Sequence, residues 1–109
     1  MSKLFLKATP EMKDFQEYVE FLEQERGFRH ESARDKCLLI GEEIGELFKA
    51  VREEEGLQMD SEAKPIDIAD EIADVFLYLC TIANRFNIDI ETAVRQKEEK
   101  NKNRVWTSS

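Results

Sequence analysis

The stretch LLIGEEIGELFKAV, residues 38–51, combines a helical apolar stripe with three glutamates. Its apolar residues recur at a spacing of three or four, which is typical of one face of an α-helix: Ile40, Ile44, Leu47 and Val51. At about 100° per residue, positions three apart share a helix face, so Glu43 and Glu46 project together on the shoulder of this stripe. The stretch therefore predicts an amphipathic helix that carries two carboxylates beside the surface it buries.

Helix-start and helix-stop signals divide the rest of the chain. Thr9 and Pro10 have the types expected of an N-cap and a first-turn proline, and Ser32 with Asp35 matches a capping box. The apolar run VFLYLCTIA, residues 75–83, is nearly apolar all round, which indicates a central helix or a subunit contact. The predicted helices are about 10–26, 32–55, 65–86 and 89–103, with a polar loop at 56–64.

These elements predict an all-α fold, a protomer of four-helix-bundle type that forms one domain over residues 1–109. Charged residues make up 37% of the chain and hydrophobic residues 41%, in periodic clusters, which favours a folded helical protein over a disordered acidic tail. With a net charge of −8 the chain repels phosphates, so we expect no binding to a nucleic-acid polymer through a basic face.

The same sequence gives expectations about the cellular compartment. No segment approaches the length and apolar character of a membrane span or a signal peptide, so we expect no membrane partner. Cys37 and Cys80 lie in apolar helical patterns without metal-type spacing, as buried thiols in a reducing compartment do. The expected location is cytoplasmic.

A second acid pair lies in the stretch DEIADV, residues 70–75. Glu71 and Asp74 share a face of the predicted third helix, with Tyr78 close by on that face. If the two helices pack through their apolar stripes, four acids line one seam: Glu43, Glu46, Glu71 and Asp74. A single such pair is most often a solvated face, but here two pairs lie on consecutive helices that must pack.

Converging carboxylates repel each other and raise each other's pKa values, and a hard cation removes that repulsion. Lys49 lies three residues from Glu46, but no cation is similarly placed for Glu71 or Asp74. Oxygen ligands suit Mg²⁺ or Mn²⁺. The one histidine, His30, leaves no set of ligands for zinc or for a ferritin-like di-iron site.

The ordered pair Glu42-Glu43-x-x-Glu46 and Glu71-x-x-Asp74 resembles the signature of the MazG-type, all-α nucleoside triphosphate pyrophosphohydrolases, and the similarity extends over about residues 21–106. The resemblance implies Mg²⁺-dependent cleavage of (d)NTPs between the α- and β-phosphates, giving (d)NMP and pyrophosphate, in cleansing of the nucleotide pool. It also implies that the metal ligands are Glu43, Glu46, Glu71 and Asp74. Glu43 or Glu46 is then the candidate base for the attacking water.

The predicted C-terminal helix supplies candidate substrate contacts. Lys97, Asn101 and Arg104 are spaced by four and three residues, similar to a K-x-x-x-N-x-x-R pattern that contacts phosphates and sugar in family members. A solvated helix of mixed charge is the alternative. Phe28 lies where some relatives carry an aromatic that stacks on the base, and Tyr78 is a further aromatic candidate; burial in the core is the alternative for both.

The resemblance also implies a homodimer or a dimer of dimers, with the pocket completed by the neighbouring chain. The central helix, apolar nearly all round, independently favours a subunit contact. Three narrower or competing functions stay open at this stage. They are a pyrimidine-specific dUTP or dCTP hydrolase, a non-catalytic helical homodimeric interaction module that keeps the fold, and, disfavoured by the missing histidines, a carboxylate-rich metal-binding bundle.

Overall fold

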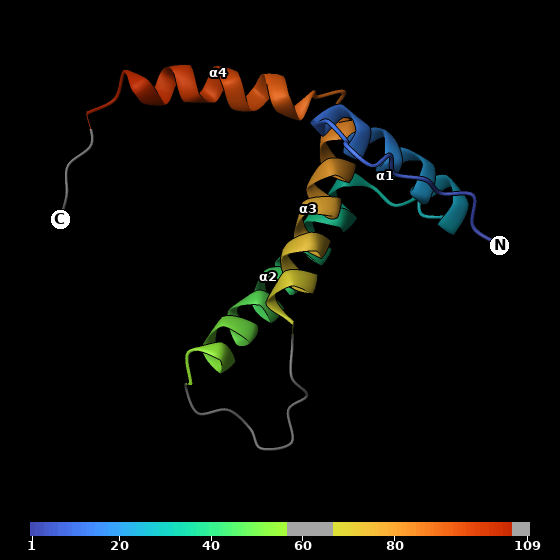
Figure 1. Cartoon of the computed structure of the whole chain (residues 1–109), viewed down its shortest axis with the longest axis horizontal. Helices are drawn as coiled ribbons and strands as arrows, with labels where there is room; N and C mark the ends of the chain where they lie inside the picture. The colour runs from blue at the N-terminus through green and yellow to red at the C-terminus, as the bar shows by residue number, and fades with distance from the viewer. Residues whose placement is uncertain (57–66, 106–109) are drawn as a thin grey trace.

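The computed structural model describes residues 1–56 and 67–105, and this part of the chain contains four α-helices and no strand (Figure 1). The helices are α1 (Met12–Arg26), α2 (Ala33–Glu54), α3 (Ile68–Arg85) and α4 (Ile90–Lys102). The prediction of an all-α fold is confirmed. The predicted loop beyond Gly56 and the first two residues of the predicted third helix lie outside the described residues.

Most helix ends follow the predicted signals. Asp35 donates its backbone N–H to Ser32 Oγ at 3.1 Å, and Ser32 donates its own to Asp35 Oδ2 at 2.9 Å, which confirms the capping box. Gly27 ends α1 with a φ of 76°, a conformation that glycine adopts without strain.

The predicted start of the first helix is wrong by a short distance. Thr9 and Pro10 precede α1, and Glu11 is its N-cap. The cause is Asp14, whose Oδ2 accepts a hydrogen bond of 2.7 Å from the backbone N–H of Glu11. The helix therefore begins where a side chain satisfies its first free donors, rather than at the proline.

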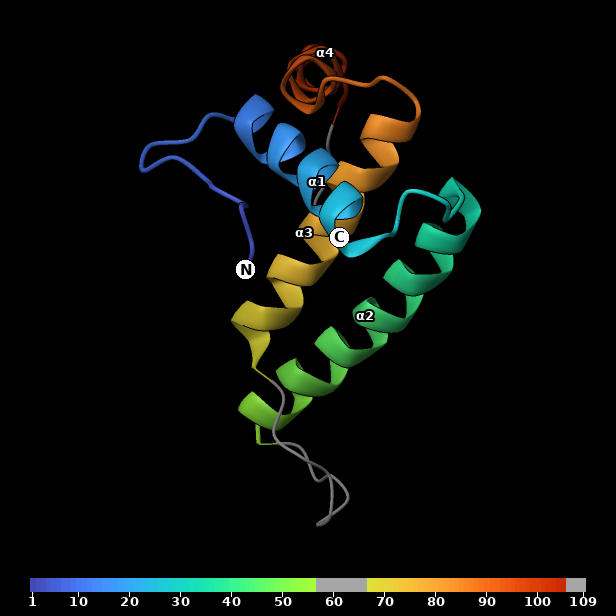
Figure 2. The same cartoon turned by 90° about the vertical axis from the view of Figure 1, so that its right-hand side faces the viewer.

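Helices α2 and α3 form an antiparallel pair, and α1 crosses the C-terminal half of α3 (Figures 1 and 2). The core at this crossing contains Val19 and Leu22 of α1 and Cys80 of α3. Beside it the rings of Phe15 and Phe76 meet edge to face, with centroids 5.4 Å apart. Because α3 packs against both α1 and α2, it is the central helix that its composition predicts.

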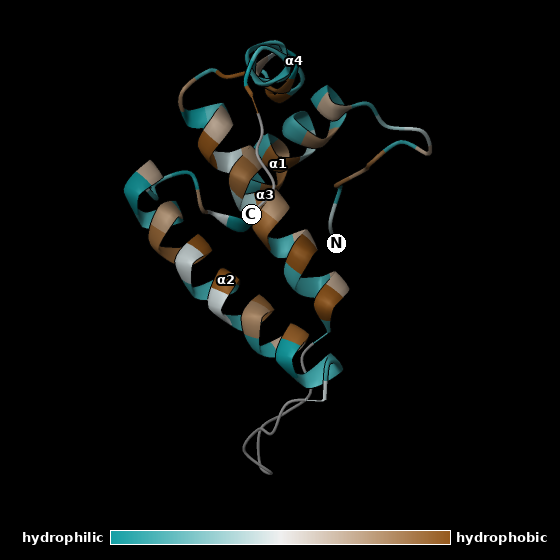
Figure 3. Cartoon of the chain, turned by 90° about the vertical axis from the view of Figure 1, so that its left-hand side faces the viewer, coloured by the Kyte–Doolittle hydropathy of each residue, from teal (hydrophilic) through white to brown (hydrophobic). Residues whose placement is uncertain are grey.

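An apolar stripe on α3 nevertheless faces outward. Ile72 is 55% exposed and Leu79 48%, and their spacing of seven residues places them on one face of the helix; Phe86, which directly follows α3, is 63% exposed. Figure 3 shows apolar bands alternating with polar ones along α2 and α3. Cys80 is buried as predicted, but the prediction of a buried thiol is wrong for Cys37, which is exposed. No helix among the described residues is long and apolar enough to cross a membrane.

Gln16, a buried residue of α1, joins three helices through its side chain. Its Nε2 donates to Asn84 Oδ1 at 3.1 Å and to the carbonyl of Ile88 at 2.8 Å. Its Oε1 accepts from the backbone N–H of Ile90, the first residue of α4, at 2.9 Å. No residue of α4 is itself buried, and the helix extends away from the α2–α3 pair (Figure 1).

Candidate metal centre

Three of the predicted acids meet between α2 and α3. Glu43 comes from the middle of α2, and Glu71 and Asp74 come from the first turns of α3. One carboxylate oxygen of each lies within 4.8 Å of the other two. We call these three residues the acid cluster. The antiparallel packing of α2 on α3 brings them together, as the spacing of the acids in the sequence predicts.

Crowding in the acid cluster raises the pKa values of two of its members, Glu43 and Asp74. The pKa of Glu43 is raised from 4.5 to about 7, first by a hydrogen bond with Glu71, then by burial and by the charges of Glu71 and Asp74. The pKa of Asp74 is raised by burial and by the neighbouring charges of Glu71 and Asp70. Both shifts have the direction expected of carboxylates that crowd together without a counter-charge.

The cluster has the properties of a site for a hard divalent cation. Glu71 Oε2 is buried and has no hydrogen-bond partner among the described residues. In that part of the chain no lysine or arginine forms an ion pair with any of the three acids, so the repulsion stays uncompensated. The donors are oxygen atoms only, which suits Mg²⁺ or Mn²⁺.

Glu46, the fourth predicted acid, lies one turn further along α2 and outside the cluster. Its side chain is 43% exposed and forms an ion pair of 3.6 Å with Lys49. Its charge still contributes to the raised pKa of Glu43, so it lies near the cluster. The structure thus separates Glu46 from the three acids that share a common centre.

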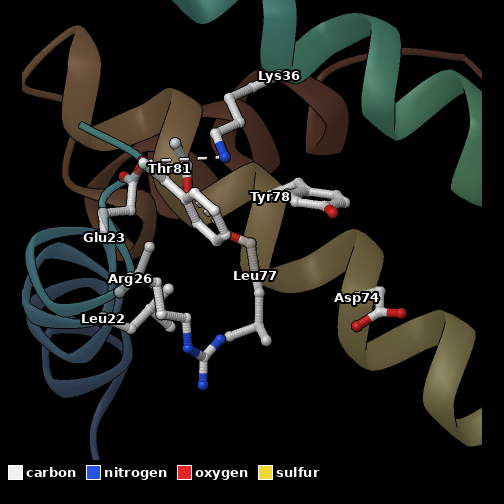
Figure 4. A pocket seen from close by; sticks show the side chains of 10 residues that line it. Leu22, Glu23, Arg26, Lys36, Asp74, Leu77, Tyr78 and Thr81 are labelled. Carbon is white, nitrogen blue, oxygen red and sulfur yellow. Dashed lines mark hydrogen bonds and ion pairs between the residues drawn. The ribbon is translucent and has the colours of Figure 1, made fainter. Parts of the chain in front are cut away.

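A cavity of about 100 Å³ adjoins the acid cluster, and Asp74 belongs to both. Phe28 and Tyr78, the predicted aromatic candidates, line this cavity together with Lys36 of α2 (Figure 4). Phe28 is 38% exposed, so it is not a fully buried core residue. The pKa of Tyr78 is raised by burial and by the charges of Glu43 and Asp74, which places its hydroxyl near the cluster.

The predicted phosphate and sugar contacts lie elsewhere in the chain. Lys97 and Asn101 belong to α4, and Arg104 follows that helix. Because α4 packs against α1 and extends away from α2 and α3, one chain alone does not bring these residues to the acid cluster (Figure 1). Their roles stay predictions.

A second charged group, which the sequence did not reveal, lies at the far end of the cavity. Glu23 is 1% exposed, and Arg85 donates to both its oxygens, at 2.7 and 3.0 Å. Lys36, 2% exposed, places its Nζ 3.9 Å from Glu23 Oε2 and 3.4 Å from Glu31 Oε1. We call Glu23, Lys36 and Arg85 the ion-pair centre.

One signal for this centre was present in the sequence. Lys36 lies one helical turn before Ile40, on the stripe that α2 buries, where a charged residue is unusual unless it is paired. The pairing with Glu23 and Arg85 was not readable, because these residues come from three separate helices or helix ends.

Comparison with protein families matches residues 30–106 to the model described as MazG nucleotide pyrophosphohydrolase domain. The matched span contains α2, α3 and α4, and with them the whole acid cluster. No individual curated protein matches the chain.

Proposed function

The chain belongs to the MazG nucleotide pyrophosphohydrolase family, and we propose that it is a Mg²⁺-dependent hydrolase that cleaves (d)NTPs between the α- and β-phosphates. The observation that carries the proposal is the convergence of Glu43, Glu71 and Asp74 around a common centre, where no lysine or arginine of the described residues forms an ion pair with them. Water adds across the anhydride, and the products are a nucleoside monophosphate and pyrophosphate. The role that suits this chemistry is cleansing of the cytoplasmic nucleotide pool.

The chain's own residues divide the work as follows. The acid cluster holds the metal, and Mn²⁺ can substitute because it accepts the same oxygen donors. The chemistry that a bound Mg²⁺ supplies is neutralisation of phosphate charge and a lower pKa for the attacking water. Glu46 takes the proton of that water, since it lies beside the cluster and its carboxylate stays accessible. The alternative assignment of the base is Glu43. The alternative role for Glu46 is that of a fourth metal ligand.

The active form is at least a homodimer. Lys97, Asn101 and Arg104 of one chain contact the phosphates and sugar bound at the acid cluster of another, because α4 extends away from its own cluster. The outward stripe on α3 gives this assembly apolar surface to bury.

A face of α2 supports the same assembly. A Cβ added at Gly41 or Gly45 would meet no atom within 4 Å in the part of the chain that the structure describes, so no contact there requires a glycine at either position. A glycine inside a helix costs about 1 kcal/mol relative to alanine. We infer that their missing side chains admit the close approach of a second copy.

The test is product analysis with purified protein, Mg²⁺ and a panel of nucleoside triphosphates. We expect equal amounts of pyrophosphate and nucleoside monophosphate; release of orthophosphate would exclude cleavage between the α- and β-phosphates. Failure to turn over any nucleotide, with the helical dimer intact, would favour the non-catalytic interaction module.

Two isosteric variants separate the roles of the glutamates. Glu46→Gln should lose turnover but still bind Mg²⁺, measured by calorimetry, whereas Glu43→Gln should lose both. Loss of Mg²⁺ binding in Glu46→Gln would instead make Glu46 a metal ligand.

A further inference from the structure

Gln16 is a polar residue on the face of α1 that is otherwise buried against α3. The buried residues of this helix include Val19 and Leu22 of the core, and Gln16 itself is 8% exposed. A buried amide costs stability unless hydrogen bonds satisfy it. Both ends of this amide are bonded, and their partners are Asn84 near the end of α3, the carbonyl of Ile88 in the turn after it, and the first residue of α4.

These hydrogen bonds hold the chain on both sides of Asp89, the N-cap of α4. Nε2 of Gln16 donates to the carbonyl of Ile88 at 2.8 Å, and its Oε1 accepts from the backbone N–H of Ile90 at 2.9 Å. The N–H of Ile90 is one of the free donors at the start of a helix, and Asp89 accepts from a different one, that of Thr92. Since hydrogen bonds weaken away from a straight geometry, one planar amide bonded on both sides of the N-cap constrains the direction in which α4 leaves.

The rest of α4 is held less closely in the part of the chain that the structure describes. None of its residues is buried, and it extends away from α2 and α3 (Figure 1). Its other contact at the same end is apolar, the packing of Ile90 against the core. An apolar contact has little directional preference, so the hydrogen bonds of Gln16 constrain the direction of α4 more narrowly than this packing does.

We propose that Gln16 is a positioning residue, which sets the direction of α4 and with it the placement of Lys97, Asn101 and Arg104 at the acid cluster of another copy. The inference rests on the proposed function, in which α4 of one chain supplies substrate contacts to another. Gln16 belongs neither to the acid cluster nor to the wall of the cavity beside it, so its effect passes through α4. It also lies outside residues 30–106, which match the family model.

The first test removes the amide and measures turnover. Gln16→Met keeps an unbranched side chain but has neither of the strong donors of the amide nor its carbonyl acceptor. We expect kcat/KM for a dNTP to fall by about tenfold to a hundredfold, the loss that a displacement of about 1 Å can cause from a distance. Mg²⁺ affinity in calorimetry should not change, because the acid cluster belongs to α2 and α3.

The matched control is Gln24→Met, at an exposed position of the same helix, which should keep the wild-type kcat/KM. An unchanged kcat/KM in Gln16→Met would overturn the inference and leave the proposed function standing. No turnover by the wild-type protein would overturn the proposed function together with the inference.

A mixed assembly separates positioning from general damage to the fold. A chain with Asp74→Asn has an intact α4 and an altered cluster, and a chain with Gln16→Met has the reverse. The two are given different affinity tags, co-expressed and purified through both tags. At the cluster of the Gln16→Met chain the intact α4 comes from its neighbour, so we expect about half of the wild-type rate, one complete site of the two in a twofold assembly. A rate no higher than that of Gln16→Met alone would overturn the inference.

The same pairing with Lys97→Ala in place of Gln16→Met tests the premise separately. It should also recover about half of the wild-type rate, because Lys97 acts at the cluster of the other chain. Recovery with Lys97→Ala but not with Gln16→Met would overturn the role of Gln16 alone. Recovery with neither would show that α4 does not act between chains, and would overturn the inference together with that part of the proposed function.

A second substitution covers the case in which Gln16→Met does not fold. Gln16→Glu keeps an acceptor for the N–H of Ile90 and loses the donor to Ile88 and Asn84. It should show the same loss of kcat/KM and the same recovery when paired with Asp74→Asn. A wild-type kcat/KM in Gln16→Glu would overturn the proposal.

Discussion

The acid cluster and the ion-pair centre lie on the same seam of the molecule but treat buried carboxylates in opposite ways. Along α2, Lys36 precedes Glu43 by two turns; along α3, Asp74 precedes Arg85 by three. At the ion-pair centre Glu23 receives two hydrogen bonds from Arg85 and has Lys36 nearby. At the acid cluster Glu43 shares a hydrogen bond with another acid, Glu71, and no lysine or arginine of the described residues forms an ion pair with it.

Removing a charge from water is costly unless an opposite charge compensates it. At the ion-pair centre the compensation comes from the chain, and the carboxylate of Glu23 links α1 to Arg85 of α3. At the acid cluster no opposite charge comes from the described residues. The repulsion between the acids therefore lowers stability there, and a cation from solution could relieve it. We propose that the difference separates a structural carboxylate from a functional one, and the following variants test that separation.

The largest expected effect is on turnover. Asp74→Asn removes one ligand charge and should lower the rate of pyrophosphate release by about a thousandfold, or roughly 4 kcal/mol of transition-state stabilisation, while circular dichroism shows unchanged helix content. Asp70→Asn is the matched control, because Asp70 is an exposed acid on the same helix outside the cluster. A similar loss in both variants would show that general negative charge, not the cluster, matters.

Breaking the ion-pair centre should affect stability instead. Arg85→Met leaves Glu23 buried with only the long contact to Lys36, and we expect the free energy of unfolding to fall by about 3–5 kcal/mol in urea denaturation. The control is Arg95→Met, which breaks an exposed ion pair with Glu91 and should cost less than about 0.5 kcal/mol. Equal effects would contradict the structural role assigned to Glu23.

Mg²⁺ should compensate the acid cluster as Arg85 compensates Glu23. At a concentration one hundred times its dissociation constant, an ion that binds only the folded state raises the free energy of unfolding by about 2.7 kcal/mol. Thermal unfolding with and without EDTA should show this rise in the wild-type protein and not in Asp74→Asn. A rise that persists in the variant would place the ion elsewhere.

The smallest expected effect is the pH dependence of the metal-free protein. Because the pKa of Glu43 is about 7 in the folded state and 4.5 otherwise, the folded protein keeps a proton that the unfolded chain has lost. Its contribution to stability is complete below about pH 4.5 and is lost as the pH rises through about 7. Allowing for solvent screening, unfolding should become easier by about 1 kcal/mol between about pH 5 and pH 8.

Glu43→Gln should flatten this slope. The capping acids Asp14, Asp35 and Asp89 have pKa values below the usual 3.8, so their contributions are lost only at lower pH and do not interfere. A slope that is unchanged in Glu43→Gln would show that other groups cause it.

The features that the sequence predicted correctly depend on residues that are close together in the sequence, within a single helix. Apolar spacing located the four helices, the capping box at Ser32 located the start of one of them, and three-residue spacing paired the acids. The acid cluster followed because two stripes that pack must bring their shoulders together. The ion-pair centre did not follow, because Glu23 and Arg85 are 62 residues apart and their contact depends on the angle at which α1 crosses α3. The direction of α4 was equally hidden, since the contacts of its first residue, Ile90, are made with residues far away in the sequence, Gln16 among them.

Gln16 holds α4 at its first residue, so a small rotation there displaces the other end of the helix by a larger distance. A helix of 13 residues is about 20 Å long, so a rotation of about 10° at its first residue moves its far end by roughly 3 Å, about the length of a hydrogen bond. The accuracy with which the far end of α4 reaches any target therefore depends on the contacts at its first residue, which are the hydrogen bond to Gln16 and the packing of Ile90 against the core.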